Sequence, residues 1–198
     1  MDPRGPTRPR SRSATRVVLE WAAIVVVAVL AAIGIRAFVV QPFSIPSGSM
    51  EPTLDVHDRI LVNKLSYRFH RVHRGDIVVF KKPATETTPG ITDLVKRVIA
   101  LPGETVSARD GRVYIDGRYL PEPWLPKVDQ GVTVFPSGIR GCLPSPPGSC
   151  RIPAGKYFML GDNRTDSADS RVLGPVPGRL FIGRAFILVW PPSRIGSL

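Results

Sequence analysis

A chain of 198 residues with 43% hydrophobic content can bury one ordinary core, which excludes disorder throughout and favours one domain plus appendages. Its 21 prolines and 18 glycines follow no period, which argues against a helical bundle and favours a loop-rich β architecture. The formal net charge of +11 suggests nucleic-acid binding, but no basic run is interleaved with the aromatic residues that a single-strand binder needs.

Residues 1–16 are predicted to be a basic cytoplasmic tail. They hold five arginines and one aspartate, a balance of +4 that leaves +7 for the rest of the chain. Because the tail directly precedes an apolar segment, anionic lipid head groups are favoured as its partner, ahead of nucleic acid.

Residues 17–40 are predicted to form one transmembrane helix. Their uninterrupted apolar part, residues 21–35, would rise only about 22 Å, whereas the whole segment rises about 36 Å against a hydrocarbon core of about 30 Å. Glu20 and Arg36 lie near the two ends, where they can reach the interface. The alternative is a cleaved signal peptide with a small-x-small site at residues 32–34, which the long apolar run and Arg36 disfavour.

Residues 41–198 are predicted to be an extracytoplasmic β-rich domain, because the arginines gather before the apolar segment. Short alternating or β-branched runs between turn signals predict strands at residues 59–62, 76–80, 95–101, 112–115, 156–160 and 180–190. Asp110-Gly111 and Asp116-Gly117 predict hairpin turns. No long amphipathic helix is expected, so the predicted fold class is mainly β, a coiled antiparallel sheet of β-barrel-like form.

Residues 121–150, dense in proline and glycine, are predicted to be a long surface excursion. The segment holds the only two cysteines of the chain, Cys142 and Cys150. An oxidising compartment would let them close a short loop, and a disulfide is favoured over free thiols. Their spacing fits no common zinc pattern and the chain has only three histidines, so no metal and no cofactor is expected.

Residues 45–54 read IPSGSMEPTL, a turn stiffened by prolines that can hold one serine hydroxyl in a fixed direction. A serine nucleophile needs a base. His57 and the pair His70 and His73 lie in polar loop segments, and the chain has no Gly-x-Ser-x-Gly elbow. A Ser-His-Asp triad is therefore disfavoured.

A lysine can serve as the base if it is neutral. A lysine with an ordinary pKa of about 10.4 is almost wholly charged at pH 7, but burial can lower that value toward neutrality. Lys96 stands in an apolar run, with branched neighbours on both sides, and Arg97 would face the other side of the sheet. On the strand alone, the alternative is a gatekeeper lysine on an edge strand.

Five segments, in this order, resemble the bacterial type I signal peptidases, membrane proteases that remove signal peptides from exported proteins. They are PSGSM with PTL at 46–50 and 52–54, DRILVNK at 58–64, RGDIV at 74–78, KR with LPGE at 96–97 and 101–104, and GDNRTDSADSR at 161–171. The resemblance covers nearly all of residues 41–191. Each segment alone is weak, but five in family order are specific.

The resemblance implies a role for each matching residue. Ser49 would be the nucleophile, Lys96 the general base, and Ser47 would donate with the Ser49 N–H to the oxyanion. Ser167 would hydrogen-bond the Lys96 amine and aim it at Ser49. The residues that would brace this loop are Asp162, Asp169 and Arg171, for which a polar turn and a surface ion pair are the alternatives.

The expected partners are signal peptides of exported preproteins, bound in extended form with small residues at the first and third positions before the cut, and the phospholipid bilayer. The protein is expected to act as a monomer. One rival is a self-cleaving repressor-type Ser/Lys protease, which needs a DNA-binding domain that residues 1–40 cannot supply. Another is a catalytically inactive, membrane-anchored peptide-binding module, which the presence of Ser49 and Lys96 disfavours.

Overall fold

The computed structural model describes residues 14–84, 90 and 92–198. It divides the chain into two units, one ending at Val39 and the other running from Val40 to Leu198. The predicted basic tail at 1–16 falls almost wholly outside the described residues. Each unit is described by itself below.

The first unit contains one helix, α1 (Ala14–Phe38). Its large apolar side chains are exposed between Val18 and Ile33, for example Trp21 at 65% and Leu30 at 63%. The stretch Thr15–Gly34 is long and apolar enough to cross a membrane. A helix that is apolar on all faces suits a lipid environment. The helix ends two residues before the predicted boundary, because Val40 begins the first strand.

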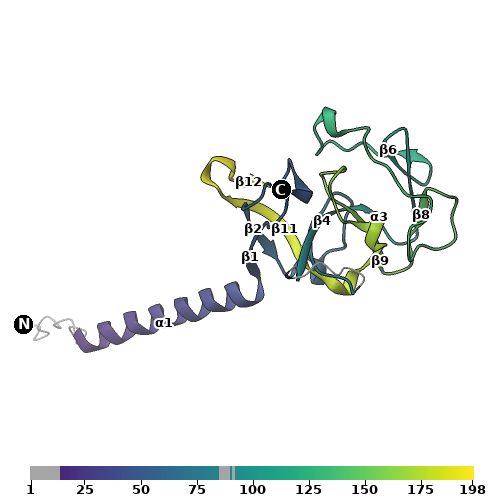
Figure 1. Ribbon diagram of the computed structural model, residues 1–198. Helices are drawn as coiled ribbons and strands as arrows, with labels where there is room; N and C mark the ends of the chain where they lie inside the picture. The colour runs from purple at the N-terminus through teal and green to yellow at the C-terminus, as the bar shows by residue number, and fades with distance from the viewer. Residues whose placement is uncertain (1–13, 85–89, 91) are drawn as a thin grey trace, which may run out of the picture. The chain divides into compact units, whose positions relative to one another are not determined.

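The second unit is built on two antiparallel sheets (Figure 1). The larger sheet has the order β1-β2-β11-β3-β4-β9-β10, with β12 paired to β11. Its strands are β1 (Val40–Ser44), β2 (Arg59–Asn63), β3 (Ile77–Lys81), β4 (Asp93–Ala100), β9 (Lys156–Leu160), β10 (Val176–Pro177), β11 (Phe181–Trp190) and β12 (Gly196–Ser197).

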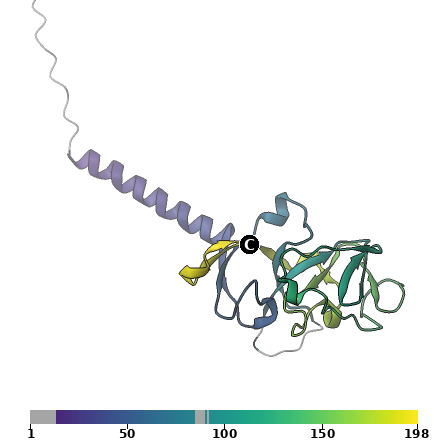
Figure 2. The same ribbon diagram turned by 90° about the horizontal axis from the view of Figure 1, so that it is seen from above.

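The smaller sheet has the order β7-β6-β5-β8. Its strands are β5 (Thr105–Arg109), β6 (Arg112–Ile115), β7 (Arg118–Tyr119) and β8 (Ser149–Arg151). Asp110 and Asp116 have positive φ, as do the glycines that follow them, which is the geometry of the two tight hairpin turns expected there. Figures 1 and 2 show this sheet at the opposite side of the unit from β1 and β2.

The prediction of a mainly β fold is confirmed, but the sheet does not close into a barrel. Within the described residues no ladder joins β1 to β10, so the larger sheet is open. Each of the six predicted strands corresponds to an observed one, and β6 and β9 have the predicted bounds. The remaining helical segments are short: α2 (Ser66–Phe69), α3 (Ser170–Leu173), and the 3-10 turns η1 (Gly48–Met50), η2 (Lys127–Asp129), η3 (Gly178–Leu180) and η4 (Pro192–Arg194).

Two apolar clusters hold the parts of the unit that matter for the site. One packs Ile45, Met50 and Leu54 against side chains of β2, β3 and β11. The other joins the smaller sheet to β9 and includes Phe135 of the excursion, whose ring lies 5.3 Å from that of Phe158. Each fully buried side chain of this size contributes about 1.5–3 kcal/mol. The segment at 121–150 is therefore partly a core element and not only a surface excursion.

Candidate active site

The turn that carries Ser49 is fixed by apolar side chains before and after it. Ile45 and Met50 are 2% and 1% exposed, and Leu54 is fully buried. The N–H of Ile45 donates to Asp58 O, and that of Leu54 to Met50 O, each across 2.9 Å. The single turn η1 thus holds Ser49 at a defined position between β1 and β2.

Lys96 lies on β4, between β3 and β9, where Val78 is its ladder partner. This interior position rules out the edge-strand alternative. Lys96 is only 3% exposed, and its Nζ lies 2.6 Å from Ser49 Oγ. Two residues far apart in the sequence are therefore brought to hydrogen-bond distance, the arrangement that a nucleophile and its base require.

Both side chains line one pocket, together with Ser47. The Ser47 and Ser49 hydroxyl oxygens lie 3.4 Å apart. The lining residues are Ile45, Pro46, Ser47, Ser49, Met50, Asp93, Leu94, Val95 and Lys96. Most of the wall is apolar, and the side chains with polar groups are those of Ser47, Ser49, Asp93 and Lys96. The three histidines, by contrast, are exposed and absent from this lining.

The loop at 161–171 contacts the nucleophile turn directly. The Asn163 N–H donates to Ser49 O and its Nδ2 to Gly48 O, each across 3.2 Å. At Gly161 there is no room for a side chain, because an added Cβ would lie 2.3 Å from both Ser49 O and Ser167 Oγ. Only glycine permits this approach of the loop to Ser49.

Ser167 lies beside Gly161 and the Ser49 carbonyl. Its hydroxyl is buried and has no hydrogen-bond partner among the described residues. The hydrogen bond to Lys96 that the family resemblance implies is therefore not formed in this structure, although the predicted residue does reach the site. A buried hydroxyl without a partner is unfavourable, typically by about 1–3 kcal/mol, so this group is available to bond a neighbour that moves into reach.

Asp162, Asp169 and Arg171 are structural parts of the loop. Asp162 pairs with Arg97, and Arg171 pairs with Asp169, across 2.6 Å and 2.8 Å between the closest atoms. Both carboxylates are fully buried, which rules out the alternative of a surface ion pair for Asp169. Asp169 Oδ2 also accepts the Gly161 N–H at 3.1 Å. These bonds define the path of the loop past the nucleophile.

Three further residues support the site and were not predicted to do so. Thr53 Oγ1 donates to Asp162 at 2.6 Å, and Glu122 and Thr133 both bond Arg164. Thr53 lies within residues 46–54, and the resemblance of this segment to the signal peptidases could have indicated its role. Glu122 and Thr133 lie in a proline- and glycine-rich stretch with no motif, so no local pattern indicates their role.

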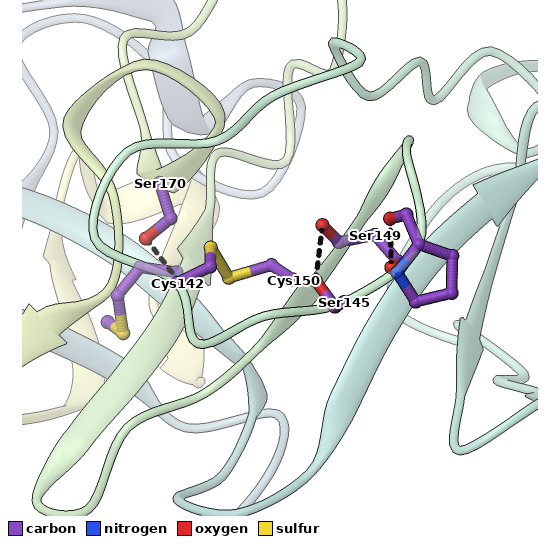
Figure 3. The surroundings of a disulfide bond; sticks show 7 residues. Cys142, Ser145, Ser149, Cys150 and Ser170 are labelled. Carbon is purple, nitrogen blue, oxygen red and sulfur yellow. Dashed lines mark hydrogen bonds between the residues drawn. A yellow bond between two sulfur atoms is a disulfide. The ribbon is translucent and has the colours of Figure 1, made fainter.

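The structure joins Cys142 and Cys150 in a disulfide, with 5.2 Å between the Cα atoms (Figure 3). Cys150 lies on β8 and is fully buried. Figure 3 also shows Ser170 near the disulfide, its Oγ accepting the Met159 N–H at 2.9 Å. Within the described residues no group of three His, Cys, Asp or Glu side chains could hold a metal ion.

A family described as "Signal peptidase, peptidase S26" matches residues 18–190 of the chain. The protein belongs to this family. The signal peptidase resemblance inferred from the five segments is thereby confirmed, and neither a repressor-type protease nor an inactive binding module is favoured. The match begins within α1 and ends with β11, so it includes every residue of the pocket.

Named relatives of the family resemble this chain over most of their length. "Probable signal peptidase I-2" of Synechocystis is 39% identical over 91% of this chain and 77% of its own. "Signal peptidase I" of Mycobacterium tuberculosis is 38% identical, and the match covers 96% of this chain and 77% of the relative. "Signal peptidase I V" of Bacillus subtilis is also 38% identical, and the match covers 82% of this chain and 94% of the relative. A crystal structure of a signal peptidase I from Enterococcus faecalis is 32% identical over 58% of this chain and 96% of that one, with a TM-score of 0.45.

Proposed function

We propose that this signal peptidase cleaves preproteins with Ser49 as the nucleophile and a neutral Lys96 as the general base. The family supplies the reaction, removal of signal peptides by a serine protease. The observation that supports the assignment of residues is the 2.6 Å separation of Lys96 Nζ from Ser49 Oγ inside an apolar pocket. No other lysine or histidine among the described residues lines that pocket.

The proposed reaction proceeds in two steps. Lys96 Nζ takes the Ser49 hydroxyl proton as Oγ forms a bond to the scissile carbonyl carbon, and the carbonyl oxygen becomes an oxyanion. The C–N bond then breaks, and Lys96 returns the proton to the leaving amine. In the second step a water molecule gives a proton to Lys96 and attacks the acyl carbon. The C–Oγ bond then breaks, Lys96 returns the proton to Ser49 Oγ, and the carboxylic acid product leaves.

The Ser47 hydroxyl and the Ser49 N–H are proposed as the oxyanion donors, because Ser47 borders the nucleophile in the same pocket. Loss of one such donor typically lowers turnover by about a hundredfold or more. Ser167 is proposed to orient the Lys96 amine once substrate closes the site, which would give its buried hydroxyl a partner. Asp162, Asp169 and Arg171 are proposed to keep the loop in place.

The substrate is proposed to lie extended between residues 45–47 and 93–96, which both line the pocket. Main-chain hydrogen bonds would give affinity there, as in other strand-addition complexes. Ile45, Met50 and Leu94 line this pocket and are proposed to restrict it to small side chains. This accounts for the expected small-x-small sequence before the cut.

The N-terminal apolar helix fits anchoring of the protein in a membrane. We further propose that residues 1–16 are cytoplasmic, residues 17–40 span the bilayer once, and residues 41–198 form the extracytoplasmic catalytic domain, acting as a monomer. The support is the excess of arginine before the span. Ser49 would then be tethered near the outer membrane surface, where a substrate held by its own apolar segment emerges.

Cleavage of a purified preprotein by the full chain in detergent tests the assignment. Wild type should cleave after a small-x-small site, while Ser49→Ala and Lys96→Ala should show no product above background. Lys156→Ala, which removes a lysine of β9 outside the pocket, should cleave at the wild-type rate. Undiminished processing by either site variant would refute the assignment. Binding of the preprotein without cleavage by wild type would refute the function.

A further inference from the structure

The loop that passes the nucleophile is held at one point by residues of the excursion. Arg164 directly follows Asn163 and donates from Nη1 to Glu122 Oε2 at 2.9 Å and to Thr133 Oγ1 at 2.8 Å. Its Nη2 pairs with Glu122 Oε1 at 2.5 Å, and its Nε donates to Gly161 O at 3.1 Å. The Arg164 side chain is fully buried and that of Glu122 is 7% exposed.

A buried ion pair of this kind contributes more to geometry than to stability. Desolvation offsets most of the attraction between buried charges, so such a pair is weak evidence for stabilisation. A planar guanidinium bound through two parallel bonds to one carboxylate, however, has a fixed orientation. The third bond, to Thr133, fixes the arginine further, because both acceptors come from the same segment.

Arg164 is closely connected to the reacting groups. Its backbone O accepts from Arg171 Nη1 at 2.6 Å, which joins it to the Asp169 pair. The residue before it, Asn163, bonds the backbone of Gly48 and Ser49. A displacement of Arg164 would thus shift both the contact with the nucleophile turn and the stretch that leads to Ser167.

The excursion is anchored independently of Arg164, so it can act as a support. The Thr133 N–H donates to Gly111 O at 2.9 Å, at the β5–β6 turn. There Gly131 passes so close that a Cβ on Gly111 would lie 1.7 Å from Gly131 O. Phe135 packs on Phe158, and Thr133 itself is 2% exposed. The support is therefore tied to the smaller sheet and to β9.

We propose that Glu122 and Thr133 are positioning residues for catalysis, which act through Arg164 to hold Asn163 against the nucleophile turn and Ser167 beside it. The proposal rests on the catalytic roles proposed above for Ser49 and Lys96. The proline- and glycine-rich segment at 121–150 would thus help to position the catalytic groups, although none of its residues lines the pocket.

The test compares Glu122→Gln and Thr133→Val with wild type, using the full chain in detergent and a signal-peptide substrate. Glu122→Gln keeps the shape of the side chain and removes its charge. We expect kcat per folded molecule to fall by about tenfold to a hundredfold, as for misplacements of about 1 Å, with KM changed less than about twofold. Thr133→Val should act in the same direction by a smaller factor.

The matched control is Glu104→Gln. Glu104 also pairs with an arginine, Arg74, across 2.7 Å, but it contacts neither the loop nor the pocket. Its kcat should equal that of wild type. Glu104 is more exposed than Glu122, at 22% against 7%, so thermal unfolding of each variant is recorded to count folded molecules.

Hydrogen exchange of the amides at 161–167 provides a readout that does not depend on activity. Exchange at Asn163, whose N–H bonds Ser49 O, should be at least about fivefold faster in Glu122→Gln and unchanged in Glu104→Gln. Unchanged exchange together with an unchanged kcat per folded molecule would overturn the proposal. If Glu122→Gln does not fold, amide exchange and kcat are measured on Thr133→Val instead. Wild-type values of both in Thr133→Val would overturn the proposal. Inactivity of wild type would instead count against the proposed function, and the exchange data would still stand.

Discussion

Arg97 and Asp162 form a buried bidentate ion pair, with 2.6 Å between Nη2 and Oδ2 and 2.9 Å between Nε and Oδ1. The side chains are 7% and 0% exposed. Because Arg97 directly follows Lys96 on β4, this pair links the strand of the proposed base to the loop that carries Ser167. The positions of these two segments are therefore coupled by one interaction.

Removal of the Asp162 carboxylate should strongly destabilise the protein. A buried arginine left without its partner typically costs about 3–5 kcal/mol, so Asp162→Ala should lower the free energy of unfolding by that amount. Urea unfolding followed by circular dichroism measures it. The control is Asp55→Ala, whose pair with Arg194 is half exposed at the carboxylate and should contribute less than about 1 kcal/mol. Equal losses in the two variants would contradict the prediction.

Cleavage should depend on a neutral Lys96. Burial in an apolar pocket disfavours the ammonium form of a lysine, and the base acts only when it is uncharged. The value of kcat/KM should therefore rise with pH through a limb well below the ordinary lysine value of about 10.4. Lys96→Arg, which keeps the charge and cannot lose it, should be inactive at every pH. A limb near pH 10 in wild type would contradict this.

Substitution of Gly161 by alanine should strongly reduce activity. The added Cβ would lie 2.3 Å from Ser49 O and Ser167 Oγ, so the loop must move away from the nucleophile turn. We expect kcat to fall by about a hundredfold or more. Gly138→Ala is the matched control, because an added Cβ there has no heavy atom within 4 Å and the backbone is not left-handed. Comparable activity of the two variants would show that the contact is unimportant.

Stability should decline at alkaline pH because of Tyr67. Burial and the neighbouring Asp76 carboxylate, which accepts from the Tyr67 hydroxyl at 3.2 Å, raise the pKa of that phenol well above its usual range. Above about pH 10 the unfolded chain loses this proton while the folded chain keeps it, so unfolding becomes more favourable as pH rises. The difference in urea stability between wild type and Tyr67→Phe should shrink from pH 9 to pH 11. A constant difference would contradict the assignment.

Reduction of the disulfide should destabilise the catalytic unit moderately. Cys142 and Cys150 are eight positions apart, and closing a loop of this length stabilises by about 2–3 kcal/mol in the chain-entropy account. A reductant should lower the thermal midpoint of wild type. The variant with both cysteines replaced by serine should start from the lower midpoint and not respond to reductant. An equal response in both proteins would show that the effect lies elsewhere.

Much of the fold could be predicted because its strands have strong local patterns. Residues 112–115 and 156–160 alternate or are β-branched and have turn signals beside them, and both became strands with those bounds. Strand β1, with the sequence VQPFS, has no such pattern. It is a strand because it pairs with β2, and the local sequence does not predict this pairing. Two-residue strands such as β7 and β10 exist only through their partners.

The candidate site could be predicted as far as its residues stand in recognisable segments. Lys96 was expected to be buried, and it is, because its strand lies inside the sheet. The Glu122–Arg164 pair was not foreseen, since nothing local to Glu122 indicates a partner 42 residues away. Whether Ser167 bonds Lys96 could not be read from sequence either, because the answer depends on the path of the loop at 161–171 past β4.

The pleat of β4 places Lys96 and Arg97 on opposite faces. The effect of an insertion in this strand therefore depends on whether the number of inserted residues is odd or even. One extra residue before Lys96 would exchange the faces, so that the amine points away from the serine and the guanidinium, which stays charged, lies on the serine's face. Two extra residues would restore the faces but displace the amine along the strand by about 7 Å. A change of length should therefore be tolerated better in the connection between β3 and β4 than within the strand itself.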